Sequence, residues 1–78
     1  MVPLSKLDAG EVGIVQELDG GRGFVGRLAA LGFTRDAEVA MVQNFGRGPL
    51  IVTVRDTRIA LGRGEAGKIQ VAKKRPSR

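Results

Sequence analysis

The spacing of apolar residues near the start of the chain changes from helical to extended. Leu4 and Leu7 lie three residues apart after Pro3, which predicts a single helical or 3₁₀ turn with both leucines on the core. From residue 12 to residue 18 the pattern has a period of two, which predicts a strand with one face inside. In this alternation Val12, Ile14 and Leu18 occupy one face of the strand, and Gly13, Val15 and Glu17 occupy the other.

A short helix is predicted next, after the turn residues Asp19, Gly20 and Gly21. Apolar side chains of segment 22–31 recur at positions i, i+4 and i+7, so they form one stripe along a helix. Gly32 follows the last apolar position, where a left-handed C-terminal cap is needed. The stripe consists of Phe24, Leu28 and Leu31, with Val25 beside them.

The second half of the chain predicts short strands separated by turn residues. Segment 37–43 (AEVAMVQ) is apolar on both faces and is expected in the middle of the sheet. Asp56 and Thr57 are expected at the tip of a tight hairpin, because Asp tolerates a positive φ. Residues 62–67 are expected to form a loop. The other predicted elements are a turn at 46–49, strands at 50–55 and 58–61, and a last strand defined by Ile69 and Val71.

These elements predict an all-β fold with one short helix, arranged as a small β-barrel of about five strands. The 12 glycines agree with closely spaced turns. A barrel also removes the exposed edges that an open five-stranded sheet presents. With 78 residues the chain has room for one hydrophobic core, and therefore for one domain.

The net charge of +5 is concentrated at one end of the chain. Residues 1–67 contain eight basic and eight acidic side chains and are neutral, so the whole excess lies in the last eleven residues. The final stretch, 73–78, is basic and has no apolar side chain besides Pro76. We therefore expect a folded domain at residues 1–72 and a basic, disordered tail at 73–78.

The chain contains no Cys and no His. This excludes disulfide scaffolds, zinc sites built on thiolate or imidazole, and thiolate nucleophiles. Ser5, Ser77 and three Thr have no His to act as a base, so no enzyme is expected. No stretch is long and apolar enough to span a bilayer, and Met1–Asp8 lacks the pattern of a signal peptide, so a cytoplasmic location is expected.

Residues 21–26 match GxGxxG, after a predicted strand and at the opening of a predicted helix. That context is typical of a dinucleotide-binding loop. However, the next strand ends at Gln43 and Asn44 without an acidic residue for a ribose, and 78 residues cannot form a doubly wound sheet. A structural role, as a turn with close packing of the helix, is the favoured interpretation.

Seven arginines between Arg22 and Arg63 leave a nucleic-acid interface open, because small barrels commonly carry that function. Three Phe, with no Tyr or Trp, provide few stacking platforms, and solvated arginines or a protein-binding face explain the same pattern. Two pairs of carboxylates leave a hard-cation site open, although solvated carboxylates at strand ends are more common. The pairs are Glu17 with Asp19 and Asp36 with Glu38.

Two segments, RLAALGF at 27–33 and RIALGRGEAGKIQV at 58–71, occur together with a turn at Gly48 and Pro49 and with spaced Leu and Gly near the start. Over residues 3–72 this combination resembles the FeoA family, small cytoplasmic proteins of bacterial ferrous iron transport. Outside the two segments, the matching positions are Leu4, Leu7, Gly10, Gly13, Ile14, Gly48 and Pro49.

The resemblance implies an SH3-like β-barrel and a partner, FeoB, which is the membrane permease with a cytoplasmic GTPase domain. Similar domains end iron- and manganese-dependent transcriptional repressors, so an SH3-like nucleic-acid-binding or transcriptional-regulator accessory module is the alternative function. The family usually has Pro-Gly where this chain has Arg35 and Asp36, and often Gly where it has Asp56. Asp also adopts left-handed backbone, so the fold is expected to be unaffected.

No metal site or cofactor is expected, because proteins hold Fe(II) mostly with imidazole, thiolate or clustered carboxylates. Contact with FeoB is expected instead, through helix 22–31 and loop 44–48. Phe45 stands between polar and Gly residues, where it is either an exposed interface anchor or folded back over the barrel end. The candidate partner-binding residues are Arg22, Val25, Arg27, Phe45 and Arg47.

Overall fold

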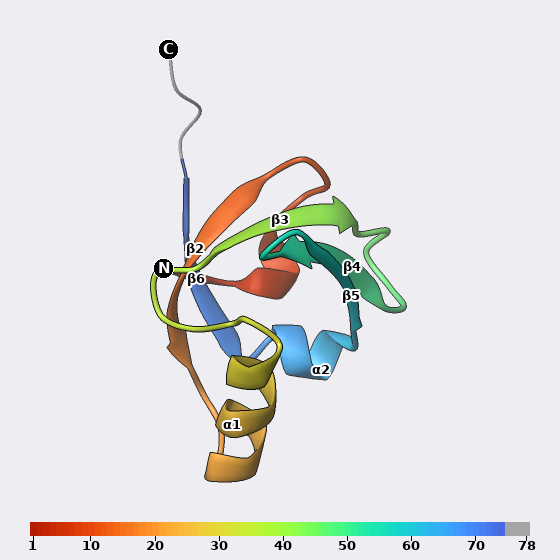
Figure 1. Ribbon diagram of the computed structural model, residues 1–78. Coiled ribbons are helices and arrows are strands. Elements are labelled where there is room, and N and C mark those ends of the chain that lie inside the picture. The colour runs from red at the N-terminus through yellow and green to blue at the C-terminus, as the bar shows by residue number, and fades with distance from the viewer. Residues whose placement is uncertain (75–78) are drawn as a thin grey trace.

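In the computed structural model, which describes residues 1–74, the chain forms one antiparallel sheet that curls around a single core (Figure 1). Neighbouring strands follow the order β1-β6-β2-β3-β4-β5. The strands are β1 (Val2–Pro3), β2 (Val12–Leu18), β3 (Glu38–Gln43), β4 (Leu50–Val54), β5 (Thr57–Leu61) and β6 (Ile69–Lys73).

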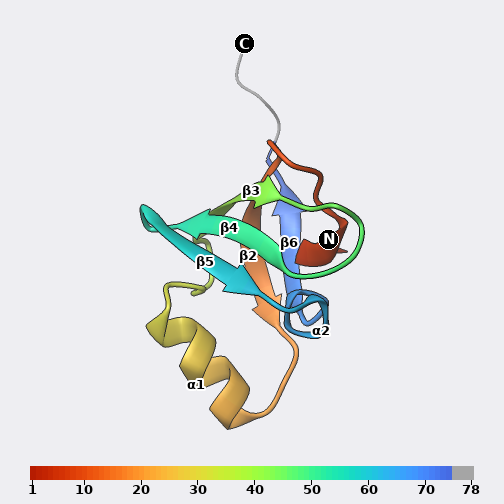
Figure 2. The ribbon, with the colours of Figure 1, turned by 90° about the vertical axis from the view of Figure 1, so that its right-hand side faces the viewer.

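Three helical segments complete the fold: η1 (Leu4–Lys6), α1 (Arg22–Ala30) and α2 (Arg63–Ala66). Figures 1 and 2 show α1 at one end of the molecule, opposite the end where β6 finishes. The segment α2 connects β5 to β6 and packs on η1, the segment that follows β1.

The core is apolar and draws on every part of the fold. Among residues 1–74 no polar or charged residue is buried, so hydrophobic contact holds these elements together. Phe33 is the largest of the buried side chains. The buried hydrophobic residues are Leu4, Leu7, Val15, Leu28, Phe33, Val39, Met41, Leu50, Val52, Val54, Leu61, Ala66, Ile69 and Val71.

The predicted fold class is confirmed, with two additions. The two residues of β1 pair with β6 and make a sixth strand, which is too short to show a sequence period. Residues 62–67, predicted to be a loop, contain the single-turn helix α2, so that prediction is wrong. Glu65 accepts a hydrogen bond from the Gly62 amide (3.3 Å), which satisfies one of the free N–H groups at the start of α2.

Strand β2 is confirmed, but its inner face begins with Gly13 and Val15, while Val12 and Ile14 are half-buried. A β-bulge between Val15 and Glu17 then shifts the alternation by one residue, so that Leu18 also packs against the core. The strict period of two therefore fails at the bulge.

The helix predicted at 22–31 is confirmed as α1, and Gly32 adopts the expected left-handed backbone (φ 107°). The apolar stripe is narrower than predicted. Leu28 is fully buried, whereas Leu31 is 42% exposed. Leu28 is the one fully buried side chain of this helix, and Phe24 packs against the core as a partly buried one.

Strand β3 is central, as predicted, because it pairs with both β2 and β4. Its outer face is not buried. Val39 and Met41 face the core, so the alternation of the strand places Val42 on the outer face, where it is 37% exposed.

The β4–β5 hairpin turns one residue earlier than predicted. Val54 pairs with Thr57, and the two residues between them, Arg55 and Asp56, have φ values of 50° and 62°. Positive φ at both positions is the signature of a two-residue type I′ turn. Asp36, the other Asp expected to be left-handed, has φ 71°.

Glycines of the GxGxxG match do not pack closely against anything. A Cβ atom at Gly21, Gly23 or Gly26 would meet no atom within 4 Å, so the predicted close packing is wrong. Gly20, just before this match, does pack closely, because a Cβ there would overlap the Phe24 ring.

Strand β6 runs one residue past the domain boundary expected at residue 72. Lys73 ends β6 and its ammonium lies 3.4 Å from a Glu11 carboxylate oxygen. Lys74 lies 2.7 Å from Glu38. The rest of the predicted tail, 75–78, lies outside the described residues.

Candidate functional site

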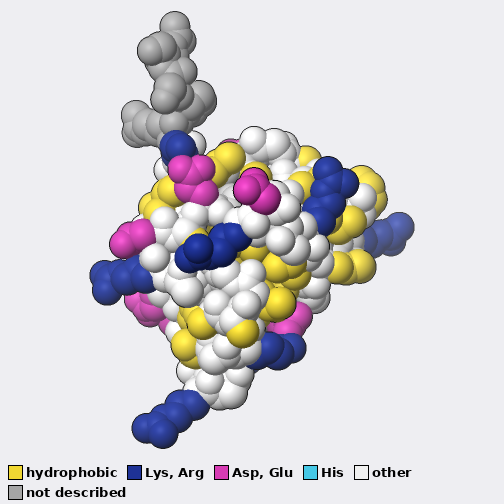
Figure 3. Space-filling model, in the orientation of Figure 1, with side chains coloured by type: hydrophobic (Ala, Val, Ile, Leu, Met, Phe, Trp, Pro, Cys, Tyr) yellow, Lys and Arg dark blue, Asp and Glu magenta, His cyan; other side chains and the backbone are white. Residues whose placement is uncertain are grey.

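The five predicted partner-binding residues lie on two separate surfaces. Arg22, Val25 and Arg27 belong to α1, while Phe45 and Arg47 belong to the connection between β3 and β4. We call the first surface the α1 groove and the second, residues 44–48, the Phe45 loop. In the orientation of Figure 3, hydrophobic side chains gather between the sheet and the helix at the bottom of the view, and Lys and Arg side chains lie both beside them and at the outline of the molecule.

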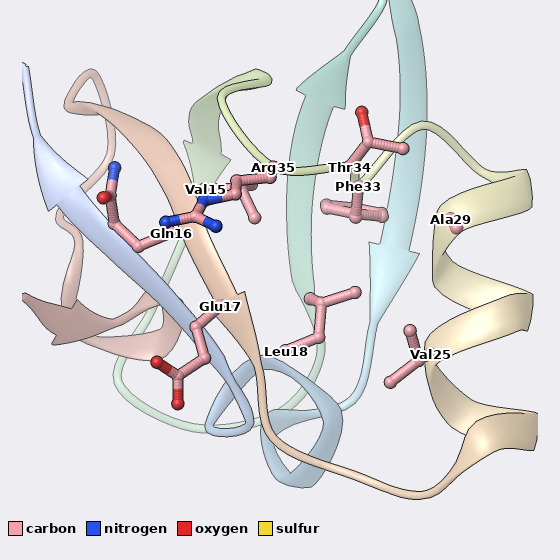
Figure 4. Close-up of a pocket in the computed structure, with 9 residues that line it drawn as sticks. All are labelled: Val15, Gln16, Glu17, Leu18, Val25, Ala29, Phe33, Thr34 and Arg35. Atoms are coloured by element: carbon pink, nitrogen blue, oxygen red, sulfur yellow. The ribbon is translucent and has the colours of Figure 1, made fainter.

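The α1 groove is a cavity of about 320 Å³ between α1 and β2 (Figure 4). Val25 and Ala29 point into it from α1, opposite Leu18 of β2. Its walls are mostly apolar and its rim is polar, an arrangement suited to an apolar side chain of a partner. The lining residues are Val15, Gln16, Glu17, Leu18, Val25, Ala29, Phe33, Thr34 and Arg35.

Charges on the groove rim influence one another. The hydrogen bond and the negative charge of Asp19 raise the pKa of Glu17 above its ordinary value, and the Arg35 guanidinium acts in the opposite direction. This pair is one of the two considered for a cation. In the other pair, Glu38 is engaged with Lys74. Residues 1–74 hold no group of three Asp, Glu, His or Cys side chains that could bind a metal ion.

Arg27 has partners within the chain. Its guanidinium lies 2.7 Å from Glu65 of α2 and 6.0 Å from the centre of the Phe24 ring. The Lys68 ammonium lies 5.4 Å from the centre of the same ring. Arg22, the first residue of α1, is exposed. Of the two arginines, Arg22 is therefore the stronger candidate for contact with a partner.

Phe45 is 77% exposed, which excludes the alternative in which it folds back over the barrel end. Arg47 is exposed on the same loop, and Gly46 and Gly48 have φ values of 84° and 75°. The left-handed backbone at both glycines turns the chain sharply around Arg47. An aromatic ring on a tight turn, with an Arg two residues away, has the composition of a protein-binding anchor.

The side-chain amide of Asn44 holds the base of this loop. Its Nδ2 donates to the carbonyl oxygens of Ser5 (3.1 Å) and Leu7 (2.7 Å). Its Oδ1 accepts from the Gly46 amide (3.0 Å) and from Nη2 of Arg63.

Asn44, Arg63 and Glu65 were not among the predicted site residues, although Asn44 is the first residue of the predicted loop 44–48. The Asn44-Phe45-Gly46 run carries the signal of an Asx turn. Gly62 followed three residues later by Glu65 carries part of a helix-start signal. Neither signal reveals that α2 contacts both surfaces, through Glu65 to Arg27 and through Arg63 to Asn44.

In the part of the chain that the structure describes, no helix has the length and apolar character needed to cross a membrane. The antiparallel sheet, curled around one core, defines a small SH3-like barrel. The chain belongs to the FeoA domain family, because the family model matches residues 2–73.

Individual relatives agree with this assignment. A Methanocaldococcus jannaschii protein named as Fe(2+) transport protein A is 37% identical over 71 residues, which cover 91% of this chain and 85% of the other. The crystal structure of an iron uptake regulatory protein (FeoA) matches with a TM-score of 0.88 and 36% identity, over 94% of this chain and 97% of the other.

Stenotrophomonas maltophilia FeoA, crystallised with zinc and described as a procaryotic SH3 domain protein, matches with a TM-score of 0.82 and 32% identity. The match covers 92% of this chain and 91% of the other. The predicted family and the SH3-like fold are thus confirmed, and the family is associated with ferrous iron transport.

Proposed function

We propose that this protein is a non-enzymatic, cytoplasmic component of ferrous iron uptake that docks on the cytoplasmic portion of FeoB and modulates it. Membership of the FeoA family supports the transport role. The observation that carries the docking step is Phe45, a 77% exposed aromatic ring on a turn whose base is fixed by Asn44. An exposed aromatic side chain on an ordered turn is a typical interface anchor.

Contact also fits the chemistry of the chain better than carriage of iron does. The sequence has no His and no Cys, which are the usual ligands of Fe(II) besides clustered carboxylates. The α1 groove supplies a second apolar surface, with Val25 on its helical wall. Docking at either surface changes the activity of FeoB only if this protein binds one state of FeoB more tightly than another.

The test is a binding measurement between the full chain and the purified cytoplasmic domain of FeoB from the same genome. Phe45→Ala should weaken binding about 10-fold or more, the range of an interface anchor, and leave thermal stability unchanged because the ring is exposed. Val42→Ala is the matched control, since it shortens an exposed apolar side chain outside both surfaces. Equal affinity for wild type and Phe45→Ala would refute the assignment of the docking surface.

The α1 groove is tested separately with Val25→Gln, which places an amide on its apolar wall. We expect weaker binding at this position, because the amide loses hydrogen bonds to water when a partner covers it. Arg22→Ala should lower the association rate, and the effect should shrink in high salt. If neither change alters affinity or rate, the groove is not part of the docking surface.

The alternative function, nucleic-acid binding, is examined with the same protein. Tight DNA or RNA binding that falls steeply with salt and survives removal of residues 73–78 would replace the docking proposal. Binding that disappears with those residues would report only on their charge.

A further inference from the structure

The amide of Asn44 has no free hydrogen-bonding position. A side-chain amide offers two donors and two acceptor positions, and Asn44 uses all four. Its contacts join three segments that lie far apart in the sequence: η1 with the residue after it, the Phe45 loop, and α2. A half-buried group satisfied in this way holds the segments in one arrangement.

Arg63 is the contact that ties the Phe45 loop to α2. Its Nη2 donates to Asn44, and its own side chain is half-buried. The Nε atom of Arg63 is buried and has no hydrogen-bond partner among residues 1–74. The guanidinium is therefore oriented mainly by Asn44 rather than by a second acceptor.

The segment α2 is itself anchored to the rest of the fold. Ala66 is fully buried, and Glu65 pairs with Arg27 of α1. A side chain that extends from α2 thus starts from a fixed position. The hydrogen bond from Arg63 fixes Asn44 relative to α2, and Asn44 in turn fixes the loop.

Phe45 lies between the two ends of the Asx turn, since Asn44 accepts the amide hydrogen of Gly46. The ring itself is exposed and gains little order from its own contacts. Its position depends on its two neighbours in the chain. A loop that is already ordered loses less conformational entropy when a partner binds, and so binds more tightly.

We propose that Asn44 and Arg63 are positioning residues that preorganise Phe45, so that α2 sets the affinity of the Phe45 loop for its partner. The inference about affinity rests on the proposed docking on FeoB. The inference about order in the loop concerns this chain alone and is measured without a partner.

The first experiment measures order in the loop. The chain has no Trp and no Tyr, so Phe45→Trp introduces a single fluorophore at the site. Arg63→Met in this background should increase the nanosecond motion of the indole in fluorescence anisotropy decay, because the bond to Asn44 is lost. Arg47→Met is the matched control. It makes the same substitution in the Phe45 loop itself, at an arginine that does not bond to Asn44, and should leave the decay unchanged. An unchanged decay in Arg63→Met would overturn the proposal.

The conservative variant Arg63→Lys keeps the charge and one donor that can face Asn44. It should restore most of the order lost in Arg63→Met, whereas a loss due only to general destabilisation would follow the unfolding midpoint instead. If Arg63→Met does not fold, Arg63→Lys is compared with the control Arg47→Lys. Arg63→Lys should then increase the motion of the indole, by less than expected for Arg63→Met, and Arg47→Lys should leave it unchanged.

The second experiment is a double-mutant cycle on binding to the FeoB cytoplasmic domain. Arg63→Met should weaken binding about 5-fold when Phe45 is present and less than about 2-fold in the Phe45→Ala background, since the effect passes through the ring. Equal weakening in both backgrounds would mean that Arg63 touches the partner itself, and would overturn the positioning role. Absence of binding by the wild-type chain would refute the proposed function, and the anisotropy result would still decide whether Arg63 orders the loop.

Discussion

Glycine within α1 offers the sharpest test of how this helix contributes to stability. Gly26 lies in the middle of α1 and is exposed, and a Cβ added there would meet no atom within 4 Å. Glycine in a helix interior costs about 0.5–1 kcal/mol relative to alanine, mainly through backbone entropy. Gly26→Ala should therefore stabilise the protein by about 0.5–1 kcal/mol, provided that α1 unfolds together with the barrel.

The matched control is Gly32→Ala, at the end of the same helix, which should change the free energy of unfolding in the opposite direction. The φ of 107° at Gly32 is unfavourable for any residue with a Cβ, and that atom would lie 2.9 Å from Cδ of Arg55. Arg55 can move aside only by weakening its hydrogen bond to Thr34 (3.0 Å). Gly32→Ala should therefore destabilise the protein by about 1–3 kcal/mol.

Both variants are compared with wild type by thermal and urea unfolding followed by circular dichroism. In a domain of this size, 1 kcal/mol corresponds to about 4–8 °C, so Tm should rise by about 2–8 °C for Gly26→Ala and fall by about 4 °C or more for Gly32→Ala. A Gly26→Ala protein with unchanged Tm would refute the reasoning. It would mean that α1 opens independently of the barrel, and slower amide exchange confined to α1 would identify that case.

Three other changes test the core, the sheet and the groove rim. Leu28→Ala should lower the free energy of unfolding by about 2–5 kcal/mol in a urea titration, because the side chain is fully buried; a loss below 1 kcal/mol would show that α1 hardly contributes to the core. Gly13→Ala should be destabilising, measured as Tm, because the added Cβ would lie 2.8 Å from Cγ2 of Val71. Asp19→Asn should lower the pKa of Glu17 in an NMR titration of its carboxyl group, because Asp19 is the main cause of the upward shift. A raised pKa of Glu17 in the folded state makes stability fall as pH rises above 4.5, the ordinary pKa of a Glu carboxyl. Asp19→Asn should therefore make this fall in stability smaller. A steeper fall would contradict the assignment.

Much of the fold follows from patterns within a few residues. Alternation located the strands, and the stripe of Phe24 and Leu28 located α1, because these signals arise from side chains that face the same core. The left-handed backbone at Gly32 was also predictable from the local sequence, because a helix end favours glycine in that conformation.

The errors occur where a contact from elsewhere changes the local pattern. A bulge after Val15 shifts the alternation of β2, and the pairing of β3 changes register between Met41 and Gln43. Both shifts depend on pairing with another strand, which the sequence of one strand does not specify. The segment α2 was missed because a single turn is too short to show a helical period.

The candidate site divides in the same way. The sequence alone singled out Phe45, because an aromatic between polar and Gly residues is visible without a fold, and it singled out helix 22–31 as the other candidate face. Only the tertiary structure decided that Phe45 is exposed and that Asn44 fixes its loop. Three of the four hydrogen-bond partners of Asn44 lie 39, 37 and 19 residues away, at Ser5, Leu7 and Arg63, and such distant groups meet only when the core brings η1, β3 and α2 together.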